Sequence, residues 1–336
     1  VLVQGSSQRA VQVVVRKRVK APSKAAAQAL LNAVAITSRT QQDWTYVTLT
    51  ESGRPVTTLD VEIHAPKSSR QLQIETLSGN LEVYDMDGLV QVGTGGGTIQ
   101  MDRIGGDVTA RTGGGDIELG RIDGSARCLS AGGSIRVASV GGALRLETGG
   151  GDIQVRETGG EVRASTAGGN IRVDRAAAAV FAHTAGGRID VQEAGGLVTA
   201  GNSGGSIRVG AANGVQCESA GGLIRLRGTS GAMRAFTDAG SILAELASQV
   251  PIEDSILSTG GGDITVLIPS NIALTVMALN DSIRSGRIVS EFGEIPVRQV
   301  NLPNRRGTLA EGSLNGGGPM LRISASGGTI HLRRQD

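Results

Sequence analysis

A short motif recurs along most of this 336-residue chain: two glycines, a variable residue, isoleucine, any residue and an aliphatic residue. The isoleucine or leucine anchors of its copies are Ile63, Leu81, Ile99, Ile117, Ile135, Ile153, Ile171, Ile189, Ile207, Ile224, Ile242 and Ile264. The first eight spacings between anchors are 18 residues, and the last three are 17, 18 and 22. A period held over so many copies indicates a repeat protein in which each unit packs on its neighbours.

Two stretches of each repeat alternate between apolar and polar residues. With the anchor numbered as slot 1, slots 1, 3, 10 and 12 are apolar in nearly every copy, whereas slots 2 and 11 hold mostly Arg, Gln, Glu or Thr. A period of two is that of a strand with one buried face. Glycines near slots 7–8 and 16–17 separate the strands, so each repeat comprises two half-rungs of nine residues. We therefore expect an all-β protein, a parallel β-solenoid whose ~18-residue rungs stack ~4.8 Å apart.

One copy of the repeat tests the part played by glycine at the corners. The copy that begins at Ile171 carries Ala176–Ala179 where other copies have the mid-rung glycines. If this corner required a positive φ, Ala178 would be strained by about 1 kcal/mol. We expect instead that the corner adopts ordinary φ values and that glycine serves close packing.

The interior of such a rung is thin, because the small residues of slot 12 face the larger ones across it. Aromatic side chains would overpack this space, and they make up only 2% of the chain. Those within the repeats fall in outward slots and are Tyr84, Phe181 and Phe236. Slot 14, by contrast, is a column of Thr and Ser whose hydroxyls we expect to point inward and bond backbone groups at the turn.

The repeat divides the chain into three parts. Residues 1–60 do not follow it, and we expect an N-terminal cap of strands plus one short helix near residues 25–31, covering the first rung. Residues 61–279 are the solenoid repeats. Residues 280–336 are a C-terminal excursion followed by closing rungs, because two apolar pairs near the end, at 321–323 and 330–332, are nine residues apart. We expect these pairs to form the last rung or two of the stack.

Gly114-Gly115-Asp116-Ile117-Glu118-Leu119 is a typical copy of the repeat, and the tail runs through Gly262-Asp263-Ile264-Thr265-Val266, Gly307-Thr308-Leu309 and Gly328-Thr329-Ile330. In this ordered combination the sequence resembles a bacterial family of Gly-rich β-solenoids that carries the label of adhesin, a domain of unknown function. The resemblance implies an exported protein, secreted or at the bacterial cell surface. The sequence starts at Val1 without Met, so we expect a mature chain whose signal peptide has been removed. The resemblance offers no catalytic residues, so we expect no enzyme activity.

Several kinds of site are not expected. A calcium β-roll needs several oxygen ligands per site, yet an acidic residue follows the glycine pair only at Asp116, Asp152 and Asp263, so we expect neither metal nor cofactor. Cys128 and Cys217 share slot 12 about five rungs apart, ~24 Å, too far for a disulfide. A net charge of +2 argues against a nucleic-acid partner, and no apolar run approaches the ~18 residues of a membrane span.

Arginine columns are the best candidate site, because guanidinium groups bind sulfate or carboxylate groups in bidentate fashion. Slot 11 carries Arg127, Arg145 and Arg163, and slot 2, on the opposite face, carries Arg136, Arg172, Arg208 and Arg225. Either column could form a face for an anionic ligand such as an acidic polysaccharide. The alternative is that neighbouring carboxylates, Glu147 and Glu161 among them, neutralise the arginines.

These observations favour a non-catalytic exported solenoid that acts as an adhesion or binding module for a surface glycan or protein. An alternative is a structural subunit of an extracellular filament, which would bind copies of itself end to end. A more remote alternative is a polysaccharide-acting β-helix enzyme using Glu157 and Asp174. Their neighbours Arg156 and Arg175 make cross-rung salt bridges the simpler expectation.

Overall fold

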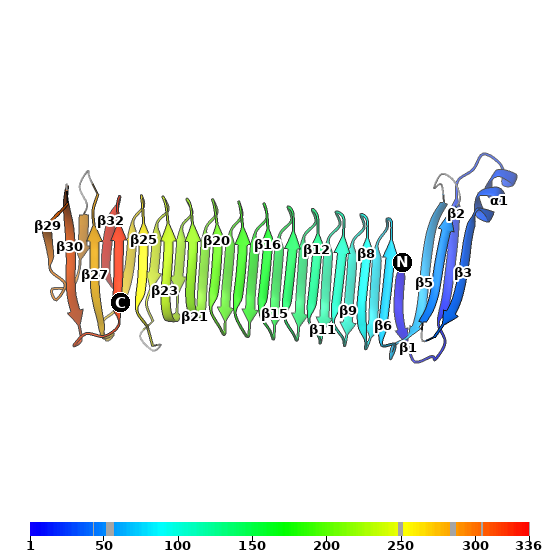
Figure 1. The fold of residues 1–336 in the computed structure, drawn as a ribbon, viewed down its shortest axis with the longest axis horizontal. Coiled ribbons are helices and arrows are strands. Elements are labelled where there is room, and N and C mark those ends of the chain that lie inside the picture. Colours follow the sequence, from blue (N-terminus) through cyan, green and yellow to red (C-terminus); the bar gives the residue numbers. More distant parts are fainter. Residues whose placement is uncertain (43, 52–56, 248–250, 283–286, 304, 336) are drawn as a thin grey trace.

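A computed structural model describes residues 1–336 apart from 43, 52–56, 248–250, 283–286, 304 and 336. The described chain forms a long rod, a parallel β-solenoid of about 11 turns with ~18-residue rungs (Figure 1). This confirms the expected fold class. Each rung contributes one strand to each of two faces, called here the anchor face and the second face.

The anchor face contains the strands that begin at the anchor residues. They are β7 (Leu81–Met86), β9 (Ile99–Ile104), β11 (Ile117–Ile122), β13 (Ile135–Val140), β15 (Ile153–Thr158), β17 (Ile171–Ala176), β19 (Ile189–Ala194), the first part of β21 (Ile207–Ser219), β22 (Ile224–Arg227), β24 (Ile242–Glu245) and β26 (Ile264–Pro269). The second face is formed by β6 (Gln71–Thr76), β8 (Leu89–Thr94), β10 (Val108–Thr112), β12 (Ala126–Ser130), β14 (Leu144–Thr148), β16 (Val162–Thr166), β18 (Val180–Thr184), β20 (Val198–Asn202), the last part of β21, β23 (Thr229–Thr237) and β25 (Ser255–Thr259).

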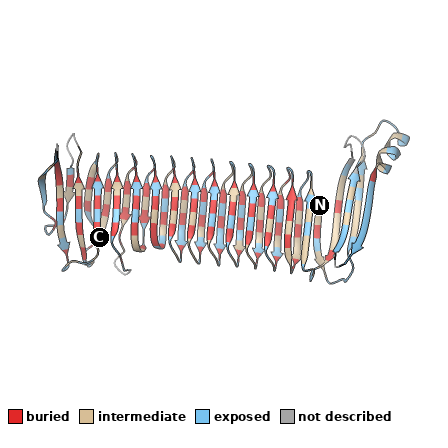
Figure 2. Ribbon diagram, in the orientation of Figure 1, coloured by how far each residue is buried: buried red, intermediate tan, exposed pale blue. Residues whose placement is uncertain are grey.

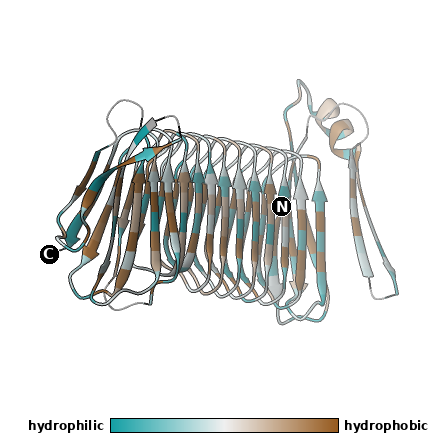
Figure 3. Cartoon of the chain, turned by 60° about the vertical axis from the view of Figure 1, so that its left-hand side comes forward, coloured by the Kyte–Doolittle hydropathy of each residue, from teal (hydrophilic) through white to brown (hydrophobic). Residues whose placement is uncertain are grey.

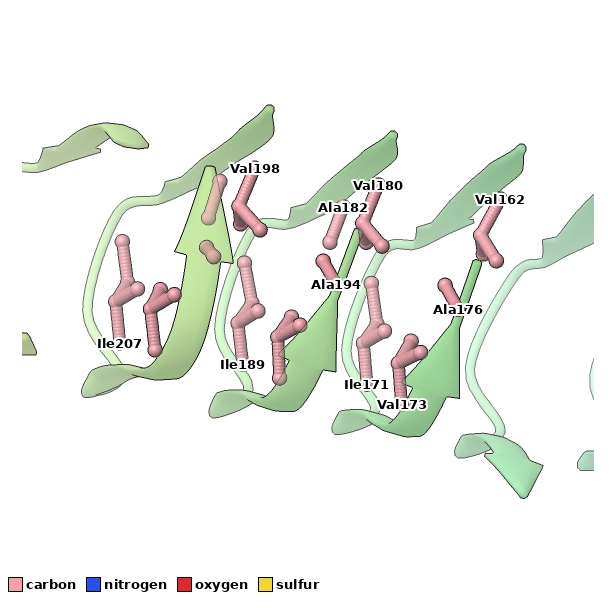
Figure 4. Close-up of a cluster of buried hydrophobic side chains, with 14 of the residues drawn as sticks. Val162, Ile171, Val173, Ala176, Val180, Ala182, Ile189, Ala194, Val198 and Ile207 are labelled. Carbon is pink, nitrogen blue, oxygen red and sulfur yellow. The ribbon is translucent and has the colours of Figure 1, made fainter. Parts of the chain in front are cut away.

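Register holds the repeat slots in straight ladders. Ile171 pairs with Ile153 on one side and with Ile189 on the other, and Val180 lies between Val162 and Val198 in the same way. These inward side chains are fully buried, and they stack from rung to rung through a narrow interior (Figures 2 and 4). The alternation of buried and exposed positions along each strand is the one that the sequence predicts.

The corners owe their glycines to close packing. A Cβ on Gly187 would lie 1.9 Å from the carbonyl oxygen of Gly169 in the preceding rung, whereas one on Gly186 would meet nothing closer than 3.9 Å. Among the described residues other than glycine, positive φ occurs only at Gln42, Asp85, Arg103 and Asn315. Ala178 is therefore unstrained, and the expectation of an ordinary φ at this corner is confirmed.

The hydroxyl column of slot 14 closes the other corner. Thr184 Oγ1 donates a hydrogen bond to the Gly169 carbonyl at 2.9 Å and accepts one from the Gly187 N–H at 3.1 Å. The same carbonyl bond, from a Thr or Ser to a glycine 15 residues earlier, is made by Thr94, Thr112, Ser130, Thr148, Thr166 and Thr237. The expected inward orientation is thus confirmed, and each hydroxyl links two consecutive rungs.

The N-terminal end holds a strand that the repeat did not predict. Strand β1 (Leu2–Ser6) lies between β5 (Thr57–Pro66) and β7, parallel to both, with Val3 opposite Ile63 on one side and Val83 on the other. Ile63 therefore occupies the position of slot 3. Counting it as the first anchor, in line with Leu81, was wrong, because the inserted strand separates it from the regular rungs.

Beyond β5 the cap has the elements that the sequence predicts. Strand β2 (Gln12–Val19) pairs antiparallel with β5, and α1 (Lys24–Asn32) follows, capped by the hydroxyl of Ser23. Strands β3 (Val34–Gln41) and β4 (Trp44–Glu51) form a separate antiparallel hairpin. We expected all of residues 1–60 to cover the first rung. Of these elements only β2 does so, by pairing with the edge of β5, since the β3–β4 hairpin is a separate sheet.

The C-terminal end is arranged in a similar way. Strands β31 (Met320–Ala325) and β32 (Thr329–Gln335) rejoin the stack next to β25 and β26, with Ile330 opposite Ile264. The expectation that these two strands form the end of the stack is wrong. Strands β27 (Leu274–Asn280) and β28 (Arg287–Ser290) pair with their far edges and lie beyond them. Antiparallel strands β30 (Arg305–Leu314) and β29 (Val297–Leu302) then extend the second face. The last strands of the chain are thus held inside the stack, as the first one is.

Candidate functional site

The outward side chains of the second face bring one arginine column together. Arg127, Arg145 and Arg163 lie on β12, β14 and β16, each opposite the next in register. The row continues to Phe181 on β18 and Thr199 on β20. Because neighbouring strands are ~4.8 Å apart, these side chains form a continuous line along the rod.

A hollow of about 430 Å³ opens on the second face where this row changes from arginine to smaller side chains. Ser165, Thr199 and Gly201 leave the space, while Arg145 and Glu218 stand at its two ends. Its lining residues come from five consecutive strands and are Arg145, Leu146, Glu147, Arg163, Ala164, Ser165, Phe181, Ala182, His183, Thr199, Ala200, Gly201, Gln216 and Glu218.

Arg163 and Phe181 form the most distinctive contact in this hollow. The guanidinium carbon of Arg163 lies 4.4 Å from the centroid of the Phe181 ring, a cation–π arrangement. The Nε of Arg163 is also 2.5 Å from Glu161. The ring and Glu161 together hold the guanidinium at the wall of the hollow with half of its side chain exposed to solvent.

The arginines of this column are neutralised to different degrees. Arg145 Nε lies 2.6 Å from Glu147, and Arg163 is paired with Glu161. For these two arginines, the expected alternative of neutralisation by neighbouring carboxylates is therefore confirmed. Arg127 has no ion pair within the described part of the chain. Exposed pairs of this kind contribute little to stability, which leaves their guanidinium groups able to exchange partners.

Phe181 and His183 are the functional candidates that sequence reasoning missed. The sequence analysis places Phe181 in an outward slot, but it does not connect this residue with the arginine column of the same slot. His183 lies two residues further on the same outward side of β18 and is exposed. An aromatic residue that interrupts a polar column is the signal that would have found this site.

The other arginine column is less continuous. Arg136 on β13 and Arg172 on β17 are separated by β15, while Arg208 and Arg225 are neighbours on β21 and β22. Arg136 pairs with Asp116 and Glu118 at 3.2 Å each, and Arg172 with Asp174 at 2.7 Å. The hydrogen bond and charge of Asp174 raise the pKa of the Arg172 guanidinium.

Arg136 and Arg172 border a second hollow, of about 550 Å³, on the anchor face. Gly120 and Ala138 provide its space, and Arg156 also lines it. Arg225 lies outside both hollows and is bound to Glu245 at 2.9 Å. Burial raises the pKa of Glu245, but hydrogen bonds from Arg225 and Arg227 outweigh it and the pKa falls below its ordinary value.

Of the residues weighed for enzyme chemistry, Glu157 and Arg175 form a salt bridge between rungs, whereas Asp174 pairs with Arg172 on its own strand. Arg175 lies 4.0 Å from Glu157 and 3.2 Å from Glu193 on the flanking strands. Within the described residues, no three His, Cys, Asp or Glu side chains are grouped so as to hold a metal ion. Over the same residues no helix is long and apolar enough to cross a membrane.

Both cysteines are buried, as expected, and are free thiols. Burial raises the pKa of Cys128 to about 12 and raises that of Cys217 as well. A thiol that stays protonated is a poor nucleophile. The pair therefore belongs to the packed interior and to neither hollow.

Comparison with known proteins agrees with this architecture. A model of the family described as Toastrack DUF4097 matches residues 3–208. The match supports the expected β-solenoid family but carries no adhesin label. No curated protein and no solved structure matches this chain.

Proposed function

Since this chain belongs to the Toastrack DUF4097 family, a β-solenoid family of unknown function, we propose that it is a non-catalytic extracellular binding module for an acidic polysaccharide. The single observation that carries the proposal is the row on the second face. Three successive arginines lead directly to Phe181 and the hollow beside it. The row combines charge, an aromatic ring and an open space in one line.

A linear polymer fits this geometry better than a compact ligand. Arginines repeat at the strand spacing of ~4.8 Å, which is close to the advance of one sugar ring in an extended polysaccharide. Carboxylate or sulfate groups on successive sugars would then meet Arg127, Arg145 and Arg163 in turn. Guanidinium groups bind such anions in bidentate fashion.

The hollow supplies the contacts that a sugar ring needs. The Phe181 ring offers an apolar surface for the C–H groups of a sugar, and His183 and Gln216 offer hydrogen bonds to its hydroxyls. Arg163 joins the two halves of the site, because it contacts Phe181 and is next to Arg145. The hollow of the anchor face also has a ring, Tyr84, but the arginine over it, Arg103, is paired with Asp85 and Asp102, and Arg136 already has two carboxylate partners.

Both ends of the rod favour a binding module over the filament alternative. The anchor face finishes in antiparallel β2 at the N-terminal end, and the second face finishes in antiparallel β29 at the other. The exposed residues of β29 are Arg298, Gln299 and Asn301, which are polar, and Val297, which is not. Polar edge strands of this kind oppose edge-to-edge association.

Titration calorimetry with oligogalacturonate, and with neutral galactan oligosaccharides as the control ligand, tests the proposal. Wild type should bind the acidic oligomer with an affinity that falls as salt is added, and should not bind the neutral one. Arg163→Gln and Phe181→Ala should each weaken binding about tenfold, the loss of a charge-assisted or stacking contact. Arg172→Gln, on the other face, is the matched control and should leave binding unchanged. Equal loss in the control, or equal binding of the neutral oligomers, would refute the assignment.

A further inference from the structure

The β3–β4 hairpin at the N-terminal end presents large apolar side chains to solvent. Ile36 is 44% exposed, Tyr46 41% and Trp44 37%. The chain has one tryptophan and two tyrosines in all, so its only tryptophan and one of its tyrosines lie on this one small sheet. Figure 3 shows the helix and the hairpin set apart from the end of the stack.

The aromatic residues share one face of the hairpin. Register places Arg39 opposite Tyr46 and Gln41 opposite Trp44. The two rings are 6.3 Å apart between centroids, and the guanidinium carbon of Arg39 lies 5.0 Å from the Tyr46 centroid. The opposite face carries Val34, which is buried and is the most covered residue of β3. Every other residue of β3 is exposed, so both faces of the hairpin are open to solvent beyond Val34.

Charge is concentrated at the same end of the rod. Residues 1–51, through the end of β4, contain seven Lys or Arg and two acidic residues, Asp43 and Glu51, a net charge of +5, whereas residues 52–279 carry a net charge of −6 and residues 280–336 one of +3. Arg16 and Arg18 are paired with Glu62 and Asp60. The cations of this end without an ion pair among the described residues are Arg9, Lys17, Lys20, Lys24 and Arg39, and of these Lys17 donates hydrogen bonds to the carbonyls of Leu31 and Val34.

We propose that this N-terminal end, formed by α1 and the β3–β4 hairpin, docks the rod end-on on an anionic lipid bilayer. Trp and Tyr favour the interface between water and lipid, because each has an apolar body and a polar edge. Lysine and arginine beside them are attracted to anionic headgroups. The shaft carries net negative charge, which anionic lipid repels. The C-terminal end is less basic than the N-terminal end and has neither Trp nor Tyr, so we place the contact at the N-terminal end.

A lipid surface suits these features better than a shaped partner does. The exposed groups lie on both sides of a thin two-stranded sheet, with Ile36 on one face and Trp44 on the other. A fluid interface can surround such a hairpin, whereas a folded partner would contact one face. This docking is independent of the polysaccharide site, which lies on the shaft.

Trp44 provides the test, because it is the only tryptophan and its fluorescence reports its surroundings directly. Vesicles of phosphatidylglycerol and phosphatidylcholine should shift its emission to shorter wavelength and sediment with the protein, and vesicles of phosphatidylcholine alone should do neither. Raising the salt concentration should reverse binding. Lys20→Gln/Lys24→Gln should lower sedimentation about tenfold at low salt, through two lost headgroup attractions.

The double variant Arg188→Gln/Arg234→Gln removes equal charge from the shaft, where both side chains are exposed, and should bind vesicles like wild type. Tyr46→Ala, followed by sedimentation, should weaken binding without changing the net charge. An unshifted Trp44 emission with anionic vesicles, or equal binding of neutral vesicles, would overturn the proposal. A shift that depends on protein concentration without vesicles, or on added oligosaccharide, would also overturn it and assign the hairpin to a second copy or a glycan.

Discussion

Val3 pairs in register with Val83, eighty residues further along the chain, and both side chains are fully buried. The first strand therefore holds the cap to the regular rungs. Val3→Ala should lower the free energy of unfolding of this end by about 2 kcal/mol, through the cavity that it leaves. Amide hydrogen exchange in β5 and β7 should accelerate, whereas Val14→Ala, on the outward face of β2, should have little effect. Unchanged exchange in β5 would show that β1 is not needed there.

Adjacent glycines at one corner should respond in opposite ways to alanine. Gly187→Ala places a methyl group against the Gly169 carbonyl of the preceding rung and should destabilise the protein by about 1–3 kcal/mol. Gly186→Ala meets open space and should leave the melting temperature unchanged or slightly higher. Thermal unfolding of the two variants decides the matter, and equal destabilisation would contradict the role of close packing.

Asn202 interrupts the hydroxyl column. Its Nδ2 donates to the carbonyls of Gly187 and Gly205, but its buried Oδ1 accepts no hydrogen bond. Asn202→Thr should restore the bond to Gly187 and leave no unpaired acceptor, raising the free energy of unfolding by about 1 kcal/mol. The reverse change, Thr184→Asn, should lower it. A less stable Asn202→Thr protein would show that the amide fits this corner better than a hydroxyl does.

The two buried thiols should not react with thiol reagents until the protein unfolds. The ordinary pKa of a cysteine is about 8.5, and burial raises that of Cys128 to about 12. Because the folded state holds the proton more tightly, stability is unaffected below pH 8 and falls as the pH rises above about 8.5. A chromogenic disulfide reagent at pH 8 should react with neither thiol in the native protein and with both in denaturant. Fast reaction of one thiol in the native protein would locate an opening in the stack.

The regular part of the fold followed from local chemistry, and the ends did not. The alternation of apolar and polar slots predicts the strands, their buried faces and the inward hydroxyls. Each of these features depends on residues within one or two rungs. The insertion of β1 beside Val83 and of β32 beside Ile264 depends on contacts between distant segments. The sequences of β1 and β32 are ordinary strand patterns. Nothing in either sequence indicates which strands of the stack it lies between.

The candidate site was predictable in part for a similar reason. Register follows from the repeat, so Arg127, Arg145 and Arg163 could be placed side by side from the sequence. The hollow could not, because it arises from the combined small size of Ser165 on β16 and of Thr199 and Gly201 on β20. Residue type alone marks each of these as an ordinary outward position.

The central claim is that an acidic polysaccharide lies in the hollow of the second face, and His183 allows it to be tested directly. His183 lines that hollow, while His331 lies on the anchor face, on β32. Diethyl pyrocarbonate modifies exposed imidazoles, and mass spectrometry gives the rate at each one. Oligogalacturonate should slow modification of His183 several-fold and leave that of His331 unchanged. If His183 reacts at the same rate with and without saturating oligomer, the second face is not the binding site.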